Sequence, residues 1–320
     1  MTPGVDIDRS FEKSEHVAGW HFPSIFLRVL PARTKRALRD LRGRILARYL
    51  MRKLSPLKEF EQAFEDAEVS ALLSIVVPVH DAPAVTRRCL TSLQKYAPKA
   101  QVILVDDASH QEETRALLEQ FAVHNHWILI RNGEALGHSG ACSAGANLAT
   151  RAYLCLLNSD TVVTPWCWRP IVQAFEDNPD IGVAGPSTSY GGEQTLPLAS
   201  SMRLHLDDRQ ICGYAERLLA QCSGAVLTNV SYVCGFAFFI RKGIWQRLGG
   251  FDRNLLDYCN ENELCIRVQQ AGYRTVWVRQ SYIHHFGAAS YGVMSGTKLF
   301  DARVQAGLSY IKQKHHALDL

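Results

Sequence analysis

From residue 72 onward, short and nearly continuous apolar runs alternate with segments of helical periodicity. The runs are Leu72–Val79, Val102–Val105, Trp127–Ile130, Leu154–Leu157 and Gly182–Ala184. Helical periodicity over Ala84–Tyr96 and Glu112–Val123 separates the first three runs. Strands without polar alternation are typical of parallel sheets that helices cover on both faces. The sequence therefore predicts an α/β fold around a mostly parallel sheet, continued by a strand through Val226–Ile240, a helix over Glu261–Ala271 and a strand at Thr275–Val278.

The composition is that of an ordinary globular protein, with 47% hydrophobic and 21% charged residues in a chain of 320. Its longest nearly apolar run, Val233–Ile240, is too short to span a bilayer. The acidic N-terminus has no apolar core of a secretory signal. The nine cysteines include no Cys-x-x-Cys pair, which favours reduced thiols over a disulfide framework. We therefore expect a cytoplasmic protein.

A basic segment lies near the N-terminus. Residues 28–58 hold eleven lysines or arginines and one acid, Asp40, so the segment carries +10 in a chain whose net charge is +4. An amphipathic helix within an extension over residues 1–70 is predicted by the helical spacing of Leu38, Leu41, Ile45, Tyr49 and Leu50. Three roles stay open: contact with an anionic membrane, docking on a protein partner, and packing on the rest of the chain. No nucleic-acid binding is expected, because no recognition motif accompanies the basic residues.

Carboxylates follow several of the apolar runs. In open parallel sheets, ligands bind beyond the carboxyl ends of the strands. Asp106 and Asp107 end the second run and could accept hydrogen bonds from a ribose or a base. A structural interpretation is also open, because Ser109 and Glu112 have the spacing of a helix capping box.

A run of small residues, Gly137–Gly145, follows Arg131 and Asn132 and leads into a helix. Backbone amides at such a helix start could approach a diphosphate. The run has neither the P-loop spacing nor the dinucleotide-binding spacing. Close helix packing is the alternative reason for its small side chains.

Asp160 is the candidate metal ligand, in the turn Asn158-Ser159-Asp160 after a buried run. Mg²⁺ or Mn²⁺ needs few protein ligands there, because phosphate oxygens and water complete the octahedron. The alternative is an Asx-type turn. His284 and His285 could coordinate a metal or donate to a phosphate, although a histidine can also have a packing role.

Glu261 and Glu263 open the predicted helix, where the helix dipole favours acids. Stabilisation of the helix start is therefore a sufficient structural role for one of the two acids. The other carboxylate could take the proton from an attacking hydroxyl.

Taken in order, these motifs resemble those of the family 2 glycosyltransferases, which have the GT-A fold, over about residues 72–291. Ser74-Ile75-Val76-Val77-Pro78-Val79-His80 looks like the family's first strand, Asp106-Asp107-Ala108-Ser109 like its Asp-Asp-x-Ser, and Asn158-Ser159-Asp160 like a variant of its Asp-x-Asp. Gly249-Gly250-Phe251-Asp252 resembles the Gly-Gly-Phe-Asp before the family's Glu-Asp-x-Asp-Leu-Cys, matched here by Asn260-Glu261-Asn262-Glu263-Leu264-Cys265. His285, five residues before Ser290, fits the family's His-x-x-x-x-Ser better than His284 does.

The resemblance implies an inverting, metal-dependent transfer of a sugar from a nucleotide-diphosphate donor to a saccharide or lipid-linked saccharide acceptor, in cell-surface polysaccharide synthesis. Glu261 is the implied general base, and Asp160 with His285 the implied site for Mg²⁺ or Mn²⁺. The implied donor-side residues are Pro78, His80, Asp81, Asp107, Arg131, Gly137 and Ser159. The acceptor-side candidates are Gly235, Asp252 and Glu263. The chain departs from the family pattern at Asn260, which replaces an acid, and at Glu261, which is one methylene longer than Asp.

Three parts are expected: the basic helical extension at 1–70, a GT-A domain at 71–291 and a helical tail at 292–320. The enzyme could lie at the inner face of the cell membrane through its basic segment. Two other functions stay open. Asn260 is consistent with a non-catalytic, glycosyltransferase-like binding or scaffold subunit. A sugar nucleotidyltransferase would use a similar sheet, but with a Gly-rich basic loop where this chain has Pro78–Pro83.

Overall fold

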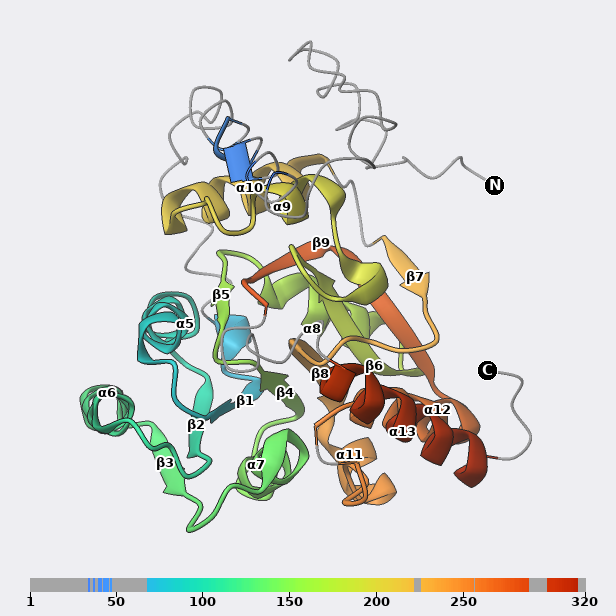
Figure 1. The fold of residues 1–320 in the computed structure, drawn as a ribbon. Helices are drawn as coiled ribbons and strands as arrows, with labels where there is room; N and C mark the ends of the chain where they lie inside the picture. Colours follow the sequence, from blue (N-terminus) through green and yellow to red (C-terminus); the bar gives the residue numbers. More distant parts are fainter. Residues whose placement is uncertain are drawn as a thin grey trace.

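The computed structural model describes residues 68–221, 226–255, 257–287 and 298–315, and residues 34, 37, 40, 41, 43–45 and 47 of the N-terminal segment. Within these residues, nine strands form a sheet in the order β3-β2-β1-β4-β8-β6-β9-β5, with β7 paired to β9 (Figure 1). The strands are β1 (Leu73–Val79), β2 (Gln101–Asp106), β3 (Ile128–Arg131), β4 (Tyr153–Leu157), β5 (Thr161–Val163), β6 (Ile181–Ser187), β7 (Leu227–Asn229), β8 (Ala237–Arg241) and β9 (Arg274–His285). The helices are α5 (Pro83–Tyr96), α6 (Glu112–Asn125), α7 (Gly137–Ala146), α8 (Trp168–Asp177), α9 (Pro197–Met202), α10 (Asp208–Gln221), α11 (Lys242–Leu248), α12 (Asn260–Gln270) and α13 (Lys298–Lys314), with a 3-10 turn η2 (Gly192–Gln194).

The first half of the sheet is parallel. β1 pairs in parallel with both β2 and β4, and β2 pairs in parallel with β3. β8 then runs antiparallel between β4 and β6, before β6 and β9 pair in parallel again. The predicted α/β fold with a mostly parallel sheet is therefore confirmed.

The prediction of one strand through Val226–Ile240 is wrong in its middle. Residues 227–229 form β7 and residues 237–241 form β8, and the chain between them lies outside the sheet. Val233 in this connection is completely buried. Its apolar character thus comes from a loop packed into the core rather than from a strand. β9 is longer than the predicted strand Thr275–Val278 and ends with His284 and His285.

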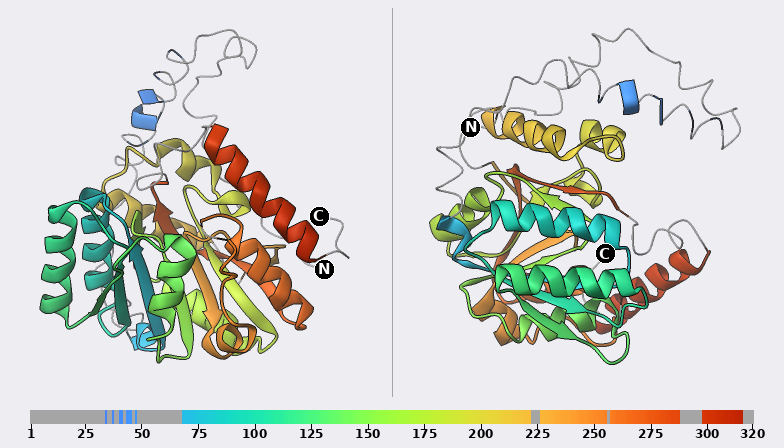
Figure 2. Two further views of the ribbon diagram at one scale, coloured as in Figure 1. Left: turned by 60° about the horizontal axis from the view of Figure 1, so that its bottom comes forward. Right: turned by 90° about the vertical axis from the view of Figure 1, so that its left-hand side faces the viewer.

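Side chains of β1 alternate between two cores on opposite faces of the sheet. Ile75, Val77 and Val79 pack with residues of α5, α6 and α8 on one face. Val76 packs with residues of α7, α11 and α12 on the other face. Because successive side chains of a strand point to opposite faces, this largely apolar strand is buried on both sides. Helices therefore cover both faces of the sheet, as predicted (Figure 2).

α9 and α10 form a further layer over β9, and the described part of the basic segment packs on it (Figure 2). Ala47 is buried among residues of α9 and α10. Asp40 lies 3.1 Å from His205 Nε2 and 2.6 Å from Arg44. Leu41 and Ile45, from the predicted apolar face, remain 51% and 48% exposed. Among the described residues of the segment, those that contact the body are thus Asp40, Gly43 and Ala47, on a different side from Leu41 and Ile45.

α13 lies beside α12 (Figure 1). Ile311 of α13 is buried in a small core with Leu255, Cys259 and Ile266. Among the helices that the structure describes, none has the length and apolar composition needed to cross a bilayer.

Candidate active site

The carboxyl ends of β1, β2 and β3 lie side by side, because these strands are parallel neighbours. Backbone hydrogen bonds continue beyond the strands: Asp107 N donates to Val79 O at 2.8 Å, and Asn132 N donates to Asp106 O at 2.9 Å. The segments that follow the three strands therefore form one edge of the sheet, where open α/β folds bind ligands.

Asp107 is held firmly at this edge. Its Oδ1 accepts hydrogen bonds from Asn132 Nδ2 at 2.7 Å and from Leu136 N at 2.9 Å. The backbone carbonyl of Asp107 accepts a hydrogen bond from His80 Nδ1 at 2.7 Å. Asp107 thus links the end of β1 to the start of α7, where Gly137 has a positive φ of 72°.

The alternative interpretation of Ser109 as a helix cap is wrong. Gln111 precedes α6, and no side chain caps this helix. Ser109 Oγ instead accepts a hydrogen bond from Asp81 N at 3.0 Å, and Ser109 N donates to Asp106 Oδ1 at 3.0 Å. Ala108 has a φ of 57°, a left-handed conformation that turns the chain here. The Asp-Asp-Ala-Ser segment therefore joins the loops after β1 and β2.

Arg131 lies at the same edge, where it forms ion pairs with two acidic residues, Asp106 and Glu119. Its Nε lies 3.4 Å from Asp106 Oδ2, and its guanidinium donates to Glu119 Oε1 at 2.8 Å. A donor contact by Arg131 stays a prediction. Pro78 lies within β1, and Ser159 is buried in the turn between β4 and β5. Their donor contacts are predictions too.

Asp160 and His285 face each other across the turn after β4. His285 Nε2 lies 3.1 Å from Asp160 Oδ1. The other ring nitrogen, Nδ1, lies 2.5 Å from the carbonyl oxygen of Tyr190. A carbonyl can only accept, so Nδ1 carries the hydrogen, and Nε2 is the ring nitrogen that faces the Asp160 carboxylate. Two electron-pair donors thus converge on one point, an arrangement that suits a shared cation.

His284 has a different environment from its neighbour. It contacts the Tyr282 hydroxyl at 2.9 Å through Nδ1 and the Arg203 carbonyl at 2.9 Å through Nε2. Burial lowers its pKa to about 3. Because side chains alternate along β9, only one of the two histidines reaches Asp160. The structure places His285 there and gives His284 a packing role.

Glu261 lies in the first turn of α12, 14% exposed. Burial raises the pKa of its carboxyl group, and His138, whose Nε2 is 3.9 Å from Oε1, offsets part of the shift. The carboxylate lies against the backbone of Gly235, where a Cβ would fall 1.7 Å from Oε1. A carboxylate with a raised pKa in a partly closed site is suited to accept a proton near neutral pH.

Two consecutive residues connect these groups. Gly235 contacts Glu261, and the ring of the next residue, Phe236, stacks on His285 with centroids 5.3 Å apart. The carbonyl of Phe236 also accepts a hydrogen bond from Asn158 N at 2.9 Å. The segment before β8 therefore contacts both Glu261 and His285.

The other two acceptor-side candidates, Asp252 and Glu263, form hydrogen bonds and ion pairs with residues of α13. Glu263 is completely buried, and Arg267, Lys314 and His315 lie 2.9, 2.7 and 3.1 Å from its Oε1. Asp252 Oδ2 accepts from the Tyr310 hydroxyl at 2.8 Å and from Lys314 Nζ at 2.5 Å. The structure gives both carboxylates an anchoring role, and an acceptor contact by either stays a prediction.

Three contributors to the site were missed in the sequence. His138 follows Gly137 directly, so its place in the small-residue run was the signal that could have indicated it. His110 follows Ser109 and approaches Asp81. Tyr190 acts through its carbonyl, which any residue has, so no sequence pattern could have identified it.

A family model described as glycosyl transferase family 2 matches residues 74–249, more than half of the chain. The matched segment includes Asp107, Asp160 and Gly235. Glu261 and His285 lie beyond its end.

Curated relatives include an uncharacterized protein, y4gI, of Sinorhizobium fredii, 22% identical over 88% of this chain and 31% of its own length. The O-antigen biosynthesis protein RfbC of Myxococcus xanthus is 27% identical over 68% of this chain and 17% of its own. The glucosyl-dolichyl phosphate glucuronosyltransferase of Haloferax volcanii is 24% identical over 60% of each chain. The chain spans less than two thirds of each of these relatives.

Two solved structures share the fold. GalNAc-T7, crystallised with UDP, GalNAc and Mn²⁺, superposes with a TM-score of 0.54 at 19% identity, over 80% of this chain and 52% of its own. The mannosyltransferase PcManGT of Pyrobaculum calidifontis, in complex with GDP-Man and Mn²⁺, superposes with a TM-score of 0.53 at 13% identity. The match covers 87% of this chain and 77% of that protein. At these identities the likeness shows the GT-A fold alone.

Proposed function

The chain belongs to glycosyl transferase family 2, and from that premise we propose that it transfers a sugar from a nucleotide-diphosphate donor to a hydroxyl group, with inversion at the anomeric carbon. The observation that carries the proposal is the arrangement around residues 235 and 236. Gly235 contacts the partly buried carboxylate of Glu261, and Phe236 stacks on the His285 ring that faces Asp160.

Asp160 and His285 would hold Mg²⁺ or Mn²⁺. Their donor atoms fit such an ion, because the Tyr190 carbonyl accepts the hydrogen bond from Nδ1 and leaves Nε2 facing the Asp160 carboxylate, where both could bind one cation. When bound, the ion would neutralise negative charge on the leaving diphosphate. Mn²⁺ in the two structural neighbours supports this assignment.

Glu261 would act as the general base. Its carboxylate takes the proton of the acceptor hydroxyl, whose oxygen forms a bond to the anomeric carbon. The bond from that carbon to the diphosphate oxygen breaks on the opposite face, and the nucleotide diphosphate leaves with the electron pair. No covalent intermediate on the protein is needed, so the configuration inverts.

Asp107, His80 and Asp81 lie at the sheet edge where the nucleotide would bind, with Asp107 held by Asn132 and Leu136. Backbone amides at the start of α7 would face the diphosphate. Acceptors are proposed to be saccharides or lipid-linked saccharides of cell-surface polysaccharides. The names of the Myxococcus xanthus and Haloferax volcanii relatives support that substrate class.

The experiment is to measure release of nucleoside diphosphate from a panel of UDP-, GDP- and dTDP-sugars with Mn²⁺ or Mg²⁺, with and without saccharide acceptors. We expect release with at least one donor, and a loss of about 100-fold or more in Glu261→Gln. No release from any donor would favour the scaffold alternative. Release of nucleoside triphosphate from a nucleotide sugar and pyrophosphate would instead favour a nucleotidyltransferase.

A peripheral position on an anionic membrane is proposed for the basic segment. Leu41 and Ile45 are half exposed beside Arg44, so they are available to a lipid surface. Flotation of the full chain with vesicles containing anionic lipid tests this. Binding should fall in the double variant Leu41→Asp, Ile45→Asp, and equal flotation of variant and wild type would refute the membrane role.

A further inference from the structure

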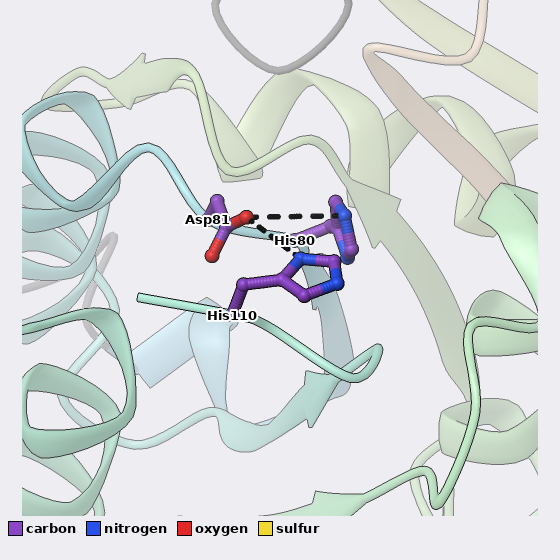
Figure 3. Close-up of side chains that lie close together, drawn as sticks. All are labelled: His80, Asp81 and His110. Carbon is purple, nitrogen blue, oxygen red and sulfur yellow. Dashed lines mark hydrogen bonds and ion pairs between the residues drawn. The ribbon is translucent and has the colours of Figure 1, made fainter. Parts of the chain in front are cut away.

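A second cluster of metal-ligating side chains includes neither Asp160 nor His285. His80, Asp81 and His110 come from the loops after β1 and β2, and each directs a ligand atom toward the other two (Figure 3). These atoms all lie within 4.8 Å of one another. Among the residues that the structure describes, no other group of three or more metal-ligating side chains gathers this closely.

The orientation of His80 is fixed by its backbone partner. Its Nδ1 lies 2.7 Å from the Asp107 carbonyl, which can only accept, so Nδ1 carries the hydrogen. Nε2 is then the nitrogen with a lone pair, and it lies 3.9 Å from Asp81 Oδ2. Metal-binding histidines in proteins are oriented in this way, by a carbonyl or carboxylate on the other ring nitrogen.

Asp81 is fixed as well. Its Oδ1 accepts a hydrogen bond from Gln111 N at 2.8 Å, and its Oδ2 lies 3.3 Å from His110 Nδ1. Burial opposes ionisation of Asp81, but the hydrogen bonds from Gln111 and His110 outweigh it and lower its pKa. The carboxylate is therefore charged and directed at both imidazoles.

The distances from Asp81 to the two imidazoles suit a small divalent cation. With Zn–N and Zn–O bonds of about 2.1 Å, neighbouring ligands of a tetrahedral zinc ion lie about 3.4 Å apart. The Asp81–His110 separation of 3.3 Å already meets this, and the His80–Asp81 separation of 3.9 Å needs a shift of about half an ångström. A site with two imidazoles and one carboxylate binds Zn²⁺ in preference to Mg²⁺ or Ca²⁺, which favour oxygen ligands.

We propose that His80, Asp81 and His110 form a second metal site, selective for Zn²⁺ or a similar imidazole-binding cation and distinct from the Asp160–His285 pair. Water completes the coordination shell. Protons compete with a cation for imidazole nitrogens and carboxylates, so binding weakens as the pH falls. It bridges the loops after β1 and β2 and holds them together.

Co²⁺ binding to the tag-free full chain tests the proposal, measured by absorption spectroscopy without nucleotide. The background is the double variant Asp160→Asn, His285→Ala, which removes the other site. We expect one bound ion with nitrogen and oxygen ligands, bound at least about tenfold more weakly in His110→Ala. His124→Ala is the matched control, an exposed histidine at the end of α6, and should bind as the background does.

Three outcomes would overturn the proposal: no bound ion, equal binding by His110→Ala and the background, or sulfur-to-cobalt charge-transfer bands, which would indicate cysteine ligands. Because the readout is metal binding without nucleotide, it is independent of whether the chain transfers sugars. A zinc-dependent rise in Tm that His110→Ala abolishes and His124→Ala retains would support the bridging of the two loops.

Discussion

Glu261 lies so close to the backbone of Gly235 that no side chain fits between them. A Cβ at residue 235 would fall 1.7 Å from Oε1, 2.6 Å from Cδ and 3.2 Å from Cγ of Glu261. All three atoms belong to the outer part of one flexible side chain. Residue 235 therefore controls where the carboxylate lies.

Gly235→Ala should displace the carboxylate while the protein stays folded. We expect transfer to fall about 100-fold, the contribution typical of a positioned general base, with nucleotide binding retained. The measurement is kcat with a saturating donor, beside the Tm. Gly243→Ala is the control, because a Cβ there meets no atom within 4 Å. Wild-type kcat in Gly235→Ala would argue against Glu261 as the base.

The pH profile should report the environment of Glu261. A base acts when deprotonated, so kcat/KM should rise with pH through a pKa above the ordinary value of 4.5, since burial raises it. His138 opposes this rise electrostatically, and His138→Asn removes that effect. The acid limb should then move to higher pH, whereas His124→Asn should leave it in place. An unmoved limb in His138→Asn would contradict the predicted coupling.

Lys314 should stabilise the attachment of α13. It lies 2.5 Å from Asp252 Oδ2 and 2.7 Å from the buried Glu263 Oε1. Lys314→Met should lower the free energy of unfolding by about 1–2 kcal/mol, because Lys314 is partly exposed and Arg267 still pairs with Glu263. Lys312→Met, an exposed position on the same helix, is the control. Equal urea midpoints for the two variants would refute this role.

The same interaction has a defined pH dependence. Burial opposes ionisation of Asp252, but hydrogen bonds from Lys314, Asn254 and Tyr310 lower its pKa from 3.8 to about 2. A carboxylate whose folded pKa is lowered stabilises the fold above its unfolded pKa, and that stabilisation is lost as the pH falls toward the folded value. The difference in unfolding free energy between wild type and Lys314→Met should therefore shrink below pH 3.8. A constant difference would contradict this assignment.

Much of the fold could be predicted, because strands that are buried on both faces have apolar sequences that can be recognised directly. Strands covered on both faces must be apolar throughout, and the runs from Leu72 to Ala184 show this. The rule that ligands bind beyond the strand ends then directed attention to Asp107 and Asp160. An apolar run does not indicate the direction of its strand, so the antiparallel insertion of β8 could not be predicted.

Candidate site residues could be proposed from the sequence only where side chains carry the chemistry. Glu261 and Glu263 are two positions apart on a helix, about 200° around its axis, so they must face different surroundings. The sequence could not say which faces α13, because that depends on tertiary packing. The tautomer of His285 depends on the Tyr190 carbonyl, a backbone group that leaves no pattern in the sequence.

The central claim is that Asp160 and His285 hold a divalent cation that binds the donor diphosphate. Calorimetric titration of the wild-type chain with UDP, GDP or dTDP, with and without Mn²⁺, tests it most directly. We predict that one nucleotide binds in the presence of Mn²⁺, and that binding weakens at least about tenfold without the cation, in Asp160→Asn or in His285→Ala. Equally strong binding without the cation, or unchanged Mn²⁺-dependent binding in both variants, would contradict the claim.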